Sequence, residues 1–176
     1  PQDGSGVHPG ITHFVLSTAI EDDNRDCVEA RRLQLTPLHR SALLASLFHD
    51  CPRRVAVTGS FGKTTITALI GWALENADLK PMVVTGGIMR NFEGDAAVGN
   101  VAPGDGSLAC IEADESDGTC VRYEPTVGLI TGFARDHMDL PELQKVYAAF
   151  AGHTRAALVL SVQAAASLFG LPGPRR

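Results

Sequence analysis

The sequence feature that most constrains this chain is a glycine loop between an apolar strand pattern and a helical pattern, VAVTGSFGKTTIT over residues 55–67. Gly59 and Gly62 allow backbone N–H groups to approach phosphate oxygens with no Cβ in the way. The helix that follows presents its positive dipole end and its unpaired N–H groups to the same anion. The pattern therefore predicts a phosphate-binding loop in which Lys63 reaches the β- and γ-phosphates and Thr64 ligates Mg²⁺.

The match to the general loop pattern G-x-x-x-x-G-K-[ST] is incomplete, because the first glycine of that pattern falls on Val57. Taken alone, the stretch leaves a second interpretation open: a glycine turn before an ordinary helix with a solvated Lys63. The context of the loop favours the phosphate-binding interpretation.

Short apolar runs alternate with helical patterns along the chain. The runs lie at 13–17, 55–57, 82–85, 108–111, 127–131 and 157–160. Apolar spacing and capping signals predict helices at 25–33, 42–49, 63–78 and 141–150. Residues 90–106 are polar and glycine-rich and predict a long loop or a hairpin. This alternation predicts an α/β fold with a mostly parallel sheet, whose functional residues gather at the carboxyl ends of the strands.

The composition narrows the class of protein. With 176 residues, the chain fits one domain, or one domain and part of another. Its net charge of −5 argues against a general nucleic-acid or membrane-surface binder, and no apolar run approaches the length of a membrane span. Its four cysteines show no C-x-x-C spacing, so they predict neither a zinc site nor a disulfide framework but the reduced thiols of a cytoplasmic protein.

An acidic stretch follows the apolar run at 108–111 and places four carboxylates within six residues, EADESD from Glu112 to Asp117. Mg²⁺ prefers a few carboxylate or hydroxyl oxygens together with phosphate oxygens and water, so the stretch predicts a magnesium site beside the nucleotide. Glu112 is the favoured ligand because it directly follows the buried run, whereas Asp114 and Glu115 lie further into the turn. At this point, an acidic surface turn that caps a helix explains the spacing equally well.

A third strand end carries the sequence DHMD, residues 136–139, after the run at 127–131. At this edge of the sheet, His137 could ligate a second metal ion or contact a phosphate. A single histidine is more often structural or simply exposed, so the residue type alone leaves both interpretations open.

Together, these strand ends resemble the Mur ligase family of ATP-dependent amino-acid ligases. The residues that carry the resemblance are Thr58–Thr65, Gly86, Gly87, Glu112–Thr119, Pro125 and Asp136–Asp139, with Ser17–Ile20, Asn24, Ala30 and Arg31 upstream. Their order and spacing agree with the family over residues 11–160. The EADESD element is similar to the branch that joins L-alanine to UDP-N-acetylmuramate in peptidoglycan precursor synthesis. The sister branch, which attaches a recovered tripeptide to the same sugar nucleotide, remains open.

The resemblance implies ATP and Mg²⁺ as cofactors, an acyl-phosphate mechanism, and UDP-N-acetylmuramate and L-alanine as small-molecule partners, with no nucleic-acid or membrane partner. It assigns phosphate binding to Thr58, Gly59, Ser60, Phe61, Gly62, Lys63, Thr64 and Thr65. It makes Lys63, Glu112 and His137 the catalytic residues. Lys63 would stabilise the transferring phosphoryl group. Thr64 and Glu112 would hold one Mg²⁺, and His137 with Glu112 would hold a second ion near the substrate carboxylate.

The sequence also departs from the family pattern. The family usually has His or Asn at the position of Phe61, Asn at the position of Gly132, and an Asn with paired acids where residues 161–164 read SVQA. These substitutions leave open a ligase-like module that binds a nucleotide or a partner without catalysis. An unrelated P-loop kinase or ATPase is a third interpretation, against which Val57 and the EADESD element argue.

The resemblance covers only part of the family's length. We interpret residues 1–51 as the C-terminal part of a Rossmann-like N-terminal domain and residues 52–176 as the first part of the central ATP-binding domain. The chain also starts without Met. We therefore expect a truncated, partial copy with no ligase activity of its own, and a detectable ligation rate with the purified chain would contradict this expectation.

Overall fold

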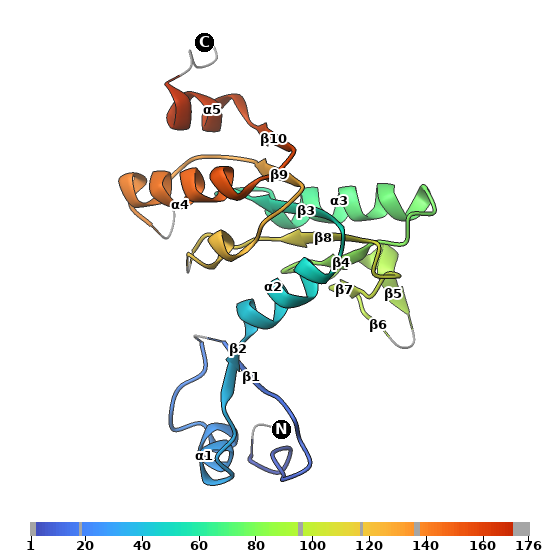
Figure 1. The fold of residues 1–176 in the computed structure, drawn as a ribbon, viewed down its shortest axis with the longest axis vertical. Helices are drawn as coiled ribbons and strands as arrows, with labels where there is room; N and C mark the ends of the chain where they lie inside the picture. The colour runs from blue at the N-terminus through green and yellow to red at the C-terminus, as the bar shows by residue number, and fades with distance from the viewer. Residues whose placement is uncertain (1–2, 18, 95–96, 117, 136–137, 171–176) are drawn as a thin grey trace. The chain divides into compact units, whose positions relative to one another are not determined.

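Strands alternate with helices around a mostly parallel sheet in the computed structural model of the chain, which confirms the predicted α/β fold (Figure 1). The structure describes residues 3–17, 19–94, 97–116, 118–135 and 138–170. The chain divides into two units, Pro1–Leu47 and Phe48–Arg176. This division does not identify domains, so the assignment of residues 1–51 to a Rossmann-like domain remains a prediction. Within the described segments, no helix is both long and apolar enough to cross a membrane.

The first unit consists of two strands joined by a helix. Its elements are β1 (Phe14–Leu16), α1 (Arg25–Arg32), β2 (Pro37–His39) and the start of α2 (Arg40–Asp50). The two strands pair in parallel, with Phe14 opposite Pro37. Asn24 caps α1, because its side chain accepts the backbone N–H of Asp26 at 2.9 Å and so satisfies a donor that the helix leaves unpaired.

The second unit is built on a six-stranded sheet. Its main elements are β3 (Arg53–Thr58), α3 (Lys63–Asn76), β4 (Met82–Val84), β7 (Val101–Ala102), β8 (Leu108–Glu112), β9 (Val127–Ile130), α4 (Leu140–His153), β10 (Ala157–Leu160) and α5 (Val162–Phe169). The strand order is β10-β9-β3-β8-β4-β7, and every pair is parallel except β4 with β7. In this register Val57 lies opposite Glu112, and Thr58 lies opposite Ile130. The carboxyl ends of β8 and β9 therefore flank the glycine loop that follows β3.

The central strands form the core of this sheet. The four apolar residues of β8, from Leu108 to Ile111, are buried, as are Ala56 and Val57 of β3. Uninterrupted apolar runs of this kind are typical of parallel strands that are covered on both faces. All four cysteines are buried. Burial raises the pKa of the Cys110 thiol to about 12, so this thiol stays protonated at neutral pH.

Residues 90–106, which were predicted as a long loop or a hairpin, contain both. A short 3₁₀ helix, η1 (Arg90–Phe92), leads into the antiparallel pair β5 (Glu93–Gly94) and β6 (Ala97–Val98). The chain then returns to the sheet edge as β7. A second 3₁₀ helix, η2 (Thr119–Arg122), follows the acidic stretch.

Candidate active site

The glycine loop turns sharply between β3 and α3. Gly59 has φ +132°, and a Cβ at this position would lie 2.3 Å from the Thr131 Oγ1 atom and 2.8 Å from the Gly132 backbone nitrogen. Gly62 is the N-cap of α3 with φ +77°, in the left-handed region that favours glycine. Only glycine fits position 59, because the loop passes directly against the end of β9.

Hydrogen bonds to β9 and the segment after it fix the loop backbone. The Thr131 hydroxyl donates to the Thr58 carbonyl at 3.2 Å and also to the Phe61 carbonyl. The Ser60 hydroxyl donates to the Ala134 carbonyl at 2.9 Å and accepts the Ala134 N–H at 3.0 Å. The Thr131 bonds end on loop carbonyls and the other two use the Ser60 hydroxyl, so none of them depends on the side chain at position 61.

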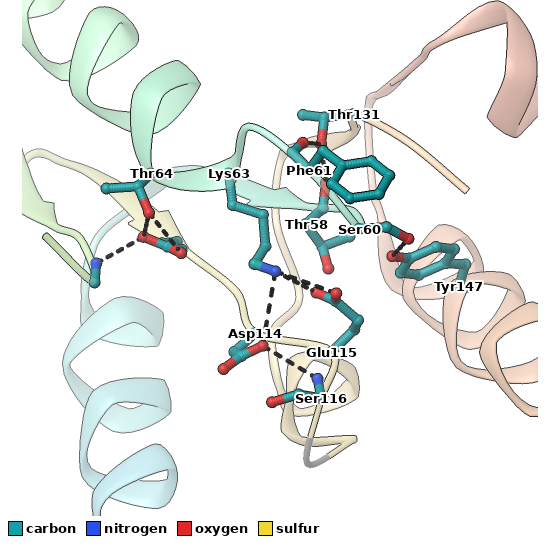
Figure 2. A network of polar contacts seen from close by, with 12 residues as sticks. Thr58, Ser60, Phe61, Lys63, Thr64, Asp114, Glu115, Ser116, Thr131 and Tyr147 are labelled. Atoms are coloured by element: carbon teal, nitrogen blue, oxygen red, sulfur yellow. Dashed lines mark hydrogen bonds and ion pairs between the residues drawn. The ribbon is translucent and has the colours of Figure 1, made fainter. Parts of the chain in front are cut away.

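A buried tyrosine supports the same anchor. The Tyr147 hydroxyl on α4 lies 3.4 Å from the Ser60 Oγ atom, and the Tyr147 side chain is fully buried (Figure 2). Burial raises the Tyr147 pKa well above its ordinary value, so the phenol remains neutral and keeps its hydrogen-bonding role throughout the physiological range.

Lys63 points toward the acidic stretch that follows β8 (Figure 2). Its Nζ atom lies 3.0 and 3.1 Å from the two carboxylate oxygens of Glu115 and 3.8 Å from Asp114 Oδ1. The side chains of Lys63 and Glu115 are only 18% and 5% exposed. The Lys63 charge is therefore paired with a largely buried carboxylate, and an incoming phosphate would compete with Glu115 for it.

Thr64 and Glu112 meet on the other side of Lys63. The Thr64 hydroxyl donates to both Glu112 oxygens, at 3.0 and 2.9 Å, and the Gly86 N–H donates to Glu112 Oε2 at 2.6 Å. The helix start brings the hydroxyl to this point, and the end of β8 brings the carboxylate. The Gly86 N–H from the end of β4 then fixes the orientation of the carboxylate.

The geometry brings most of the predicted site residues together. Lys63, Thr64 and Glu112 converge as the strand-end argument requires, and Thr58, Gly59 and Ser60 are buried beneath the loop, whereas Phe61, Gly62 and Thr65 are exposed. Asp117, Asp136 and His137 lie outside the described residues, so their proposed roles remain predictions. Sequence reasoning named Glu115 and Gly86 but missed their roles: Glu115 is the buried partner of Lys63, and Gly86 is the donor to Glu112.

The residues present fit a magnesium–nucleotide complex. A hydroxyl and a carboxylate oxygen converge at one point, and Mg²⁺ commonly takes one or two such protein ligands and completes its shell with phosphate oxygens and water. Gly62, the N-cap of α3, makes no side-chain cap hydrogen bond, so the cap leaves backbone N–H groups of the first turn available to an anion. No group of three His, Cys, Asp or Glu side chains that could hold a metal ion occurs in the described segments. A magnesium site that shares its ion with phosphate does not require one.

A cavity of about 430 Å³ opens beside the helix start. Its lining comes from the outer face of α3, including Thr64, Thr65 and Trp72, and from the η1 segment, including Arg90 and Phe92. The Trp72 and Phe92 rings meet edge to face with centroids 5.7 Å apart and close one wall. The cavity therefore offers space for a ligand beside the start of α3.

Comparison with known proteins places the glycine loop and both flanking strand ends in one family. A family model described as the Mur ligase middle domain matches residues 57–152. The UDP-N-acetylmuramate–L-alanine ligase of Microcystis aeruginosa is 41% identical over 139 residues, which cover 79% of this chain and 27% of that ligase. The chain spans less than a third of the length of the first curated relatives that it matches.

Solved structures agree with this comparison. The UDP-N-acetylmuramate-alanine ligase of Thermotoga maritima superposes with a TM-score of 0.72 at 27% identity, covering 82% of this chain and 34% of that one. The UDP-N-acetylmuramate:L-alanyl-γ-D-glutamyl-meso-diaminopimelate ligase of Neisseria meningitides has a TM-score of 0.70 at 22% identity, covering 84% of this chain and 51% of that one. At this lower identity, the second match supports the fold alone.

Proposed function

Since this chain belongs to the Mur ligase family, we propose that it carries the phosphate and magnesium half of the active site of an ATP-dependent ligase that joins L-alanine to UDP-N-acetylmuramate. The observation that carries the proposal is the pairing of Thr64 with Glu112 and of Lys63 with Glu115 where the glycine loop meets the carboxyl end of β8. The L-alanine branch is favoured over the tripeptide branch because the relative at 41% identity bears the L-alanine name. We further propose a cytoplasmic protein.

In the proposed reaction, the γ-phosphoryl group of ATP moves to the substrate carboxylate, and the amino group of L-alanine displaces phosphate from the resulting acyl phosphate. Lys63 would exchange its contact with Glu115 for the transferring phosphoryl group and stabilise the charge that develops there. Thr64 and Glu112 would hold Mg²⁺, which neutralises phosphate charge. His137 is proposed from the sequence to hold a second ion with Glu112.

We propose that the sugar nucleotide, whose carboxylate accepts the phosphoryl group, binds in the cavity beside Thr64. The cavity begins at the helix start that carries Thr64 and Thr65, and it contains the exposed Arg90, a cation suited to an anionic sugar nucleotide. A second candidate function is nucleotide binding without catalysis, which the residues at positions 61 and 132 favour because both differ from the usual family residues.

Calorimetric titration of the purified chain with ATP, with and without Mg²⁺, tests the proposal. Truncation of Lys63 alone would leave the buried Glu115 carboxylate without its cation, which costs about 3–5 kcal/mol for a fully buried pair. The informative comparison is therefore Glu115→Gln, which keeps Lys63, against the double variant Lys63→Ala with Glu115→Gln, which removes it. Lys145→Ala, an exposed lysine on α4, is the control for loss of a positive charge.

We expect Mg²⁺-dependent binding by the wild-type chain, by Glu115→Gln and by Lys145→Ala, and about 100-fold weaker binding by the double variant. Equal binding by the double variant and Glu115→Gln would exclude Lys63 as a phosphate ligand. No binding by the folded wild-type chain would contradict the proposed half-site. Detectable ligation by the same samples would exclude a module that binds a nucleotide without catalysis and would contradict the expectation that this chain has no ligase activity of its own.

A further inference from the structure

Phe61 is the most exposed large apolar side chain of the glycine loop. Its side chain is 61% exposed, whereas Ser60 is 6% exposed and Lys63 is 18% exposed and ion-paired. The Phe61 backbone is not free to move, because its carbonyl accepts the Thr131 hydroxyl. The loop therefore holds an aromatic ring at a fixed point while leaving that ring accessible.

A glycine in the segment after β9 leaves room for the Phe61 ring. Gly132 is buried, and a Cβ at this position would lie 3.6 Å from Phe61 Cδ2, at ordinary contact distance. A longer side chain at position 132 would extend against the ring or the space next to it. The glycine therefore keeps one side of the Phe61 ring free of polar side-chain atoms.

The two sides of the loop differ in charge. The side at β8 carries Glu112, Asp114 and Glu115, whereas the segment from Thr131 to Ala134 that follows β9 contains no charged residue. Figure 2 shows Thr64 on one side of Lys63 and Phe61, beside Thr131, on the other. A nucleoside triphosphate whose magnesium-bound phosphates lie at Thr64 and Glu112 would therefore extend its uncharged base toward Phe61.

We propose that Phe61 is a stacking platform for the base of a nucleoside triphosphate that binds at this loop. The inference rests on the proposed nucleotide site and adds a contact from a residue that the family pattern does not supply. The flat, uncharged face of a nucleobase matches an exposed aromatic ring. The contact acts on the base, so it contributes to affinity for nucleotides and not for inorganic polyphosphate.

The test compares the binding of ATP and of inorganic tripolyphosphate, both with Mg²⁺, to the full chain and its variants by calorimetry. Phe61→Ala removes the platform, Phe61→Trp keeps an aromatic face, and Phe169→Ala removes another exposed phenylalanine, which is 56% exposed on α5. Phe61→Ala is expected to weaken ATP binding by about 5- to 100-fold and to leave tripolyphosphate binding within about twofold. Phe61→Trp and Phe169→Ala are expected to bind both ligands like the wild type.

Each other outcome overturns a specific statement. ATP binding that is unchanged in Phe61→Ala means that the ring contacts no base, although the phosphate site stands. Equal loss of both ligands in Phe61→Ala means that the residue only shapes the loop. A wild-type chain that binds neither ligand contradicts both the platform and the proposed half-site.

Discussion

The two sides of the glycine loop are held by different kinds of interaction. On the β8 side, Thr64 pairs with Glu112 and Lys63 pairs with Glu115 through side chains, so a change in one member of a pair affects its partner. On the β9 side, the Thr131 and Ser60 hydroxyls bind backbone carbonyls and an N–H group. The residue types on the β8 side are restricted, because a substitution there breaks a side-chain contact. Residues 61 and 132 can differ without loosening the loop. The sequence follows this division, since the departures from the family pattern at the loop lie at these two positions.

The largest expected effect comes from the point where the loop and β9 touch. Gly59→Ala places a Cβ 2.3 Å from Thr131 Oγ1 and 2.7 Å from the Thr131 backbone nitrogen, so one of the two segments must move. We expect the free energy of unfolding to fall by about 3 kcal/mol in urea denaturation. Gly62→Ala is the matched control, because its left-handed φ is strained but its Cβ meets only Ile66 at 3.7 Å. It should cost about 1 kcal/mol.

A smaller effect is expected from the hydroxyl on the β8 side. Thr64→Val keeps the shape of the side chain but removes the donor to Glu112 and the proposed Mg²⁺ ligand. Binding of ATP in the presence of Mg²⁺ should weaken about tenfold, while binding without Mg²⁺ should change little. Thr64→Ser restores the hydroxyl and should restore the Mg²⁺ dependence. An unchanged magnesium effect in Thr64→Val would remove Thr64 from the metal site.

The β9 side should tolerate the usual family residues at positions 61 and 132. Gly132→Asn adds atoms against the Phe61 ring in a buried position and should reduce stability by about 1 kcal/mol. Phe61→His alone should change stability by less than about 0.5 kcal/mol, because the loop is held through its backbone. The double variant should be more stable than Gly132→Asn alone, since the smaller ring relieves the contact. Strictly additive stabilities would show that the two positions are not coupled.

The smallest expected effect is on the free energy of unfolding at moderately high pH. It involves Cys110 on β8, the strand that leads into the acidic stretch. The pKa of Cys110 is about 12 in the folded chain and near 9.0 for an unburied thiol. Above pH 9 the unfolded chain loses this proton first, so folding stability contributed by the neutral thiol is lost as pH rises from 9 to 12. The unfolding free energies of wild type and Cys110→Ala should therefore converge by about 1 kcal/mol between pH 8.5 and 10. A constant difference between them would contradict the buried, protonated thiol.

The sequence predicted the parts of this fold that depend on local pattern. The apolar runs became β3, β8, β9 and β10, and the glycine loop lies between β3 and α3, because uninterrupted apolar segments and glycine spacing have few structural alternatives. The sequence predicted only a loop or a hairpin where the two-residue strands β5, β6 and β7 lie, because segments this short show no periodic pattern of apolar residues. Their positions depend on pairing partners instead.

The site shows the same limit. Strand-end position selected Glu112, which the structure brings to Thr64, while its role as a metal ligand stays a prediction. Spacing could not show that Glu115 turns back to Lys63, because the direction of the turn at residues 113–116 depends on tertiary contacts. The Gly86 donor could not be found either, because a backbone N–H has no residue-type signal. The role of His137 lies outside the described residues and remains a prediction.

The most direct test of the difference between the two sides of the loop is amide NMR mapping of the chain with two ligands, magnesium tripolyphosphate and magnesium ATP. Both ligands should shift the amides of residues 59–65, Gly86 and residues 112–115, which follow the phosphate and metal contacts. Only ATP should also shift the amides of residues 131–134, and ATP should shift the Phe61 amide more than tripolyphosphate does. Identical shift patterns for the two ligands, or shifts confined to other parts of the sheet, would contradict a loop with a phosphate side and a base side.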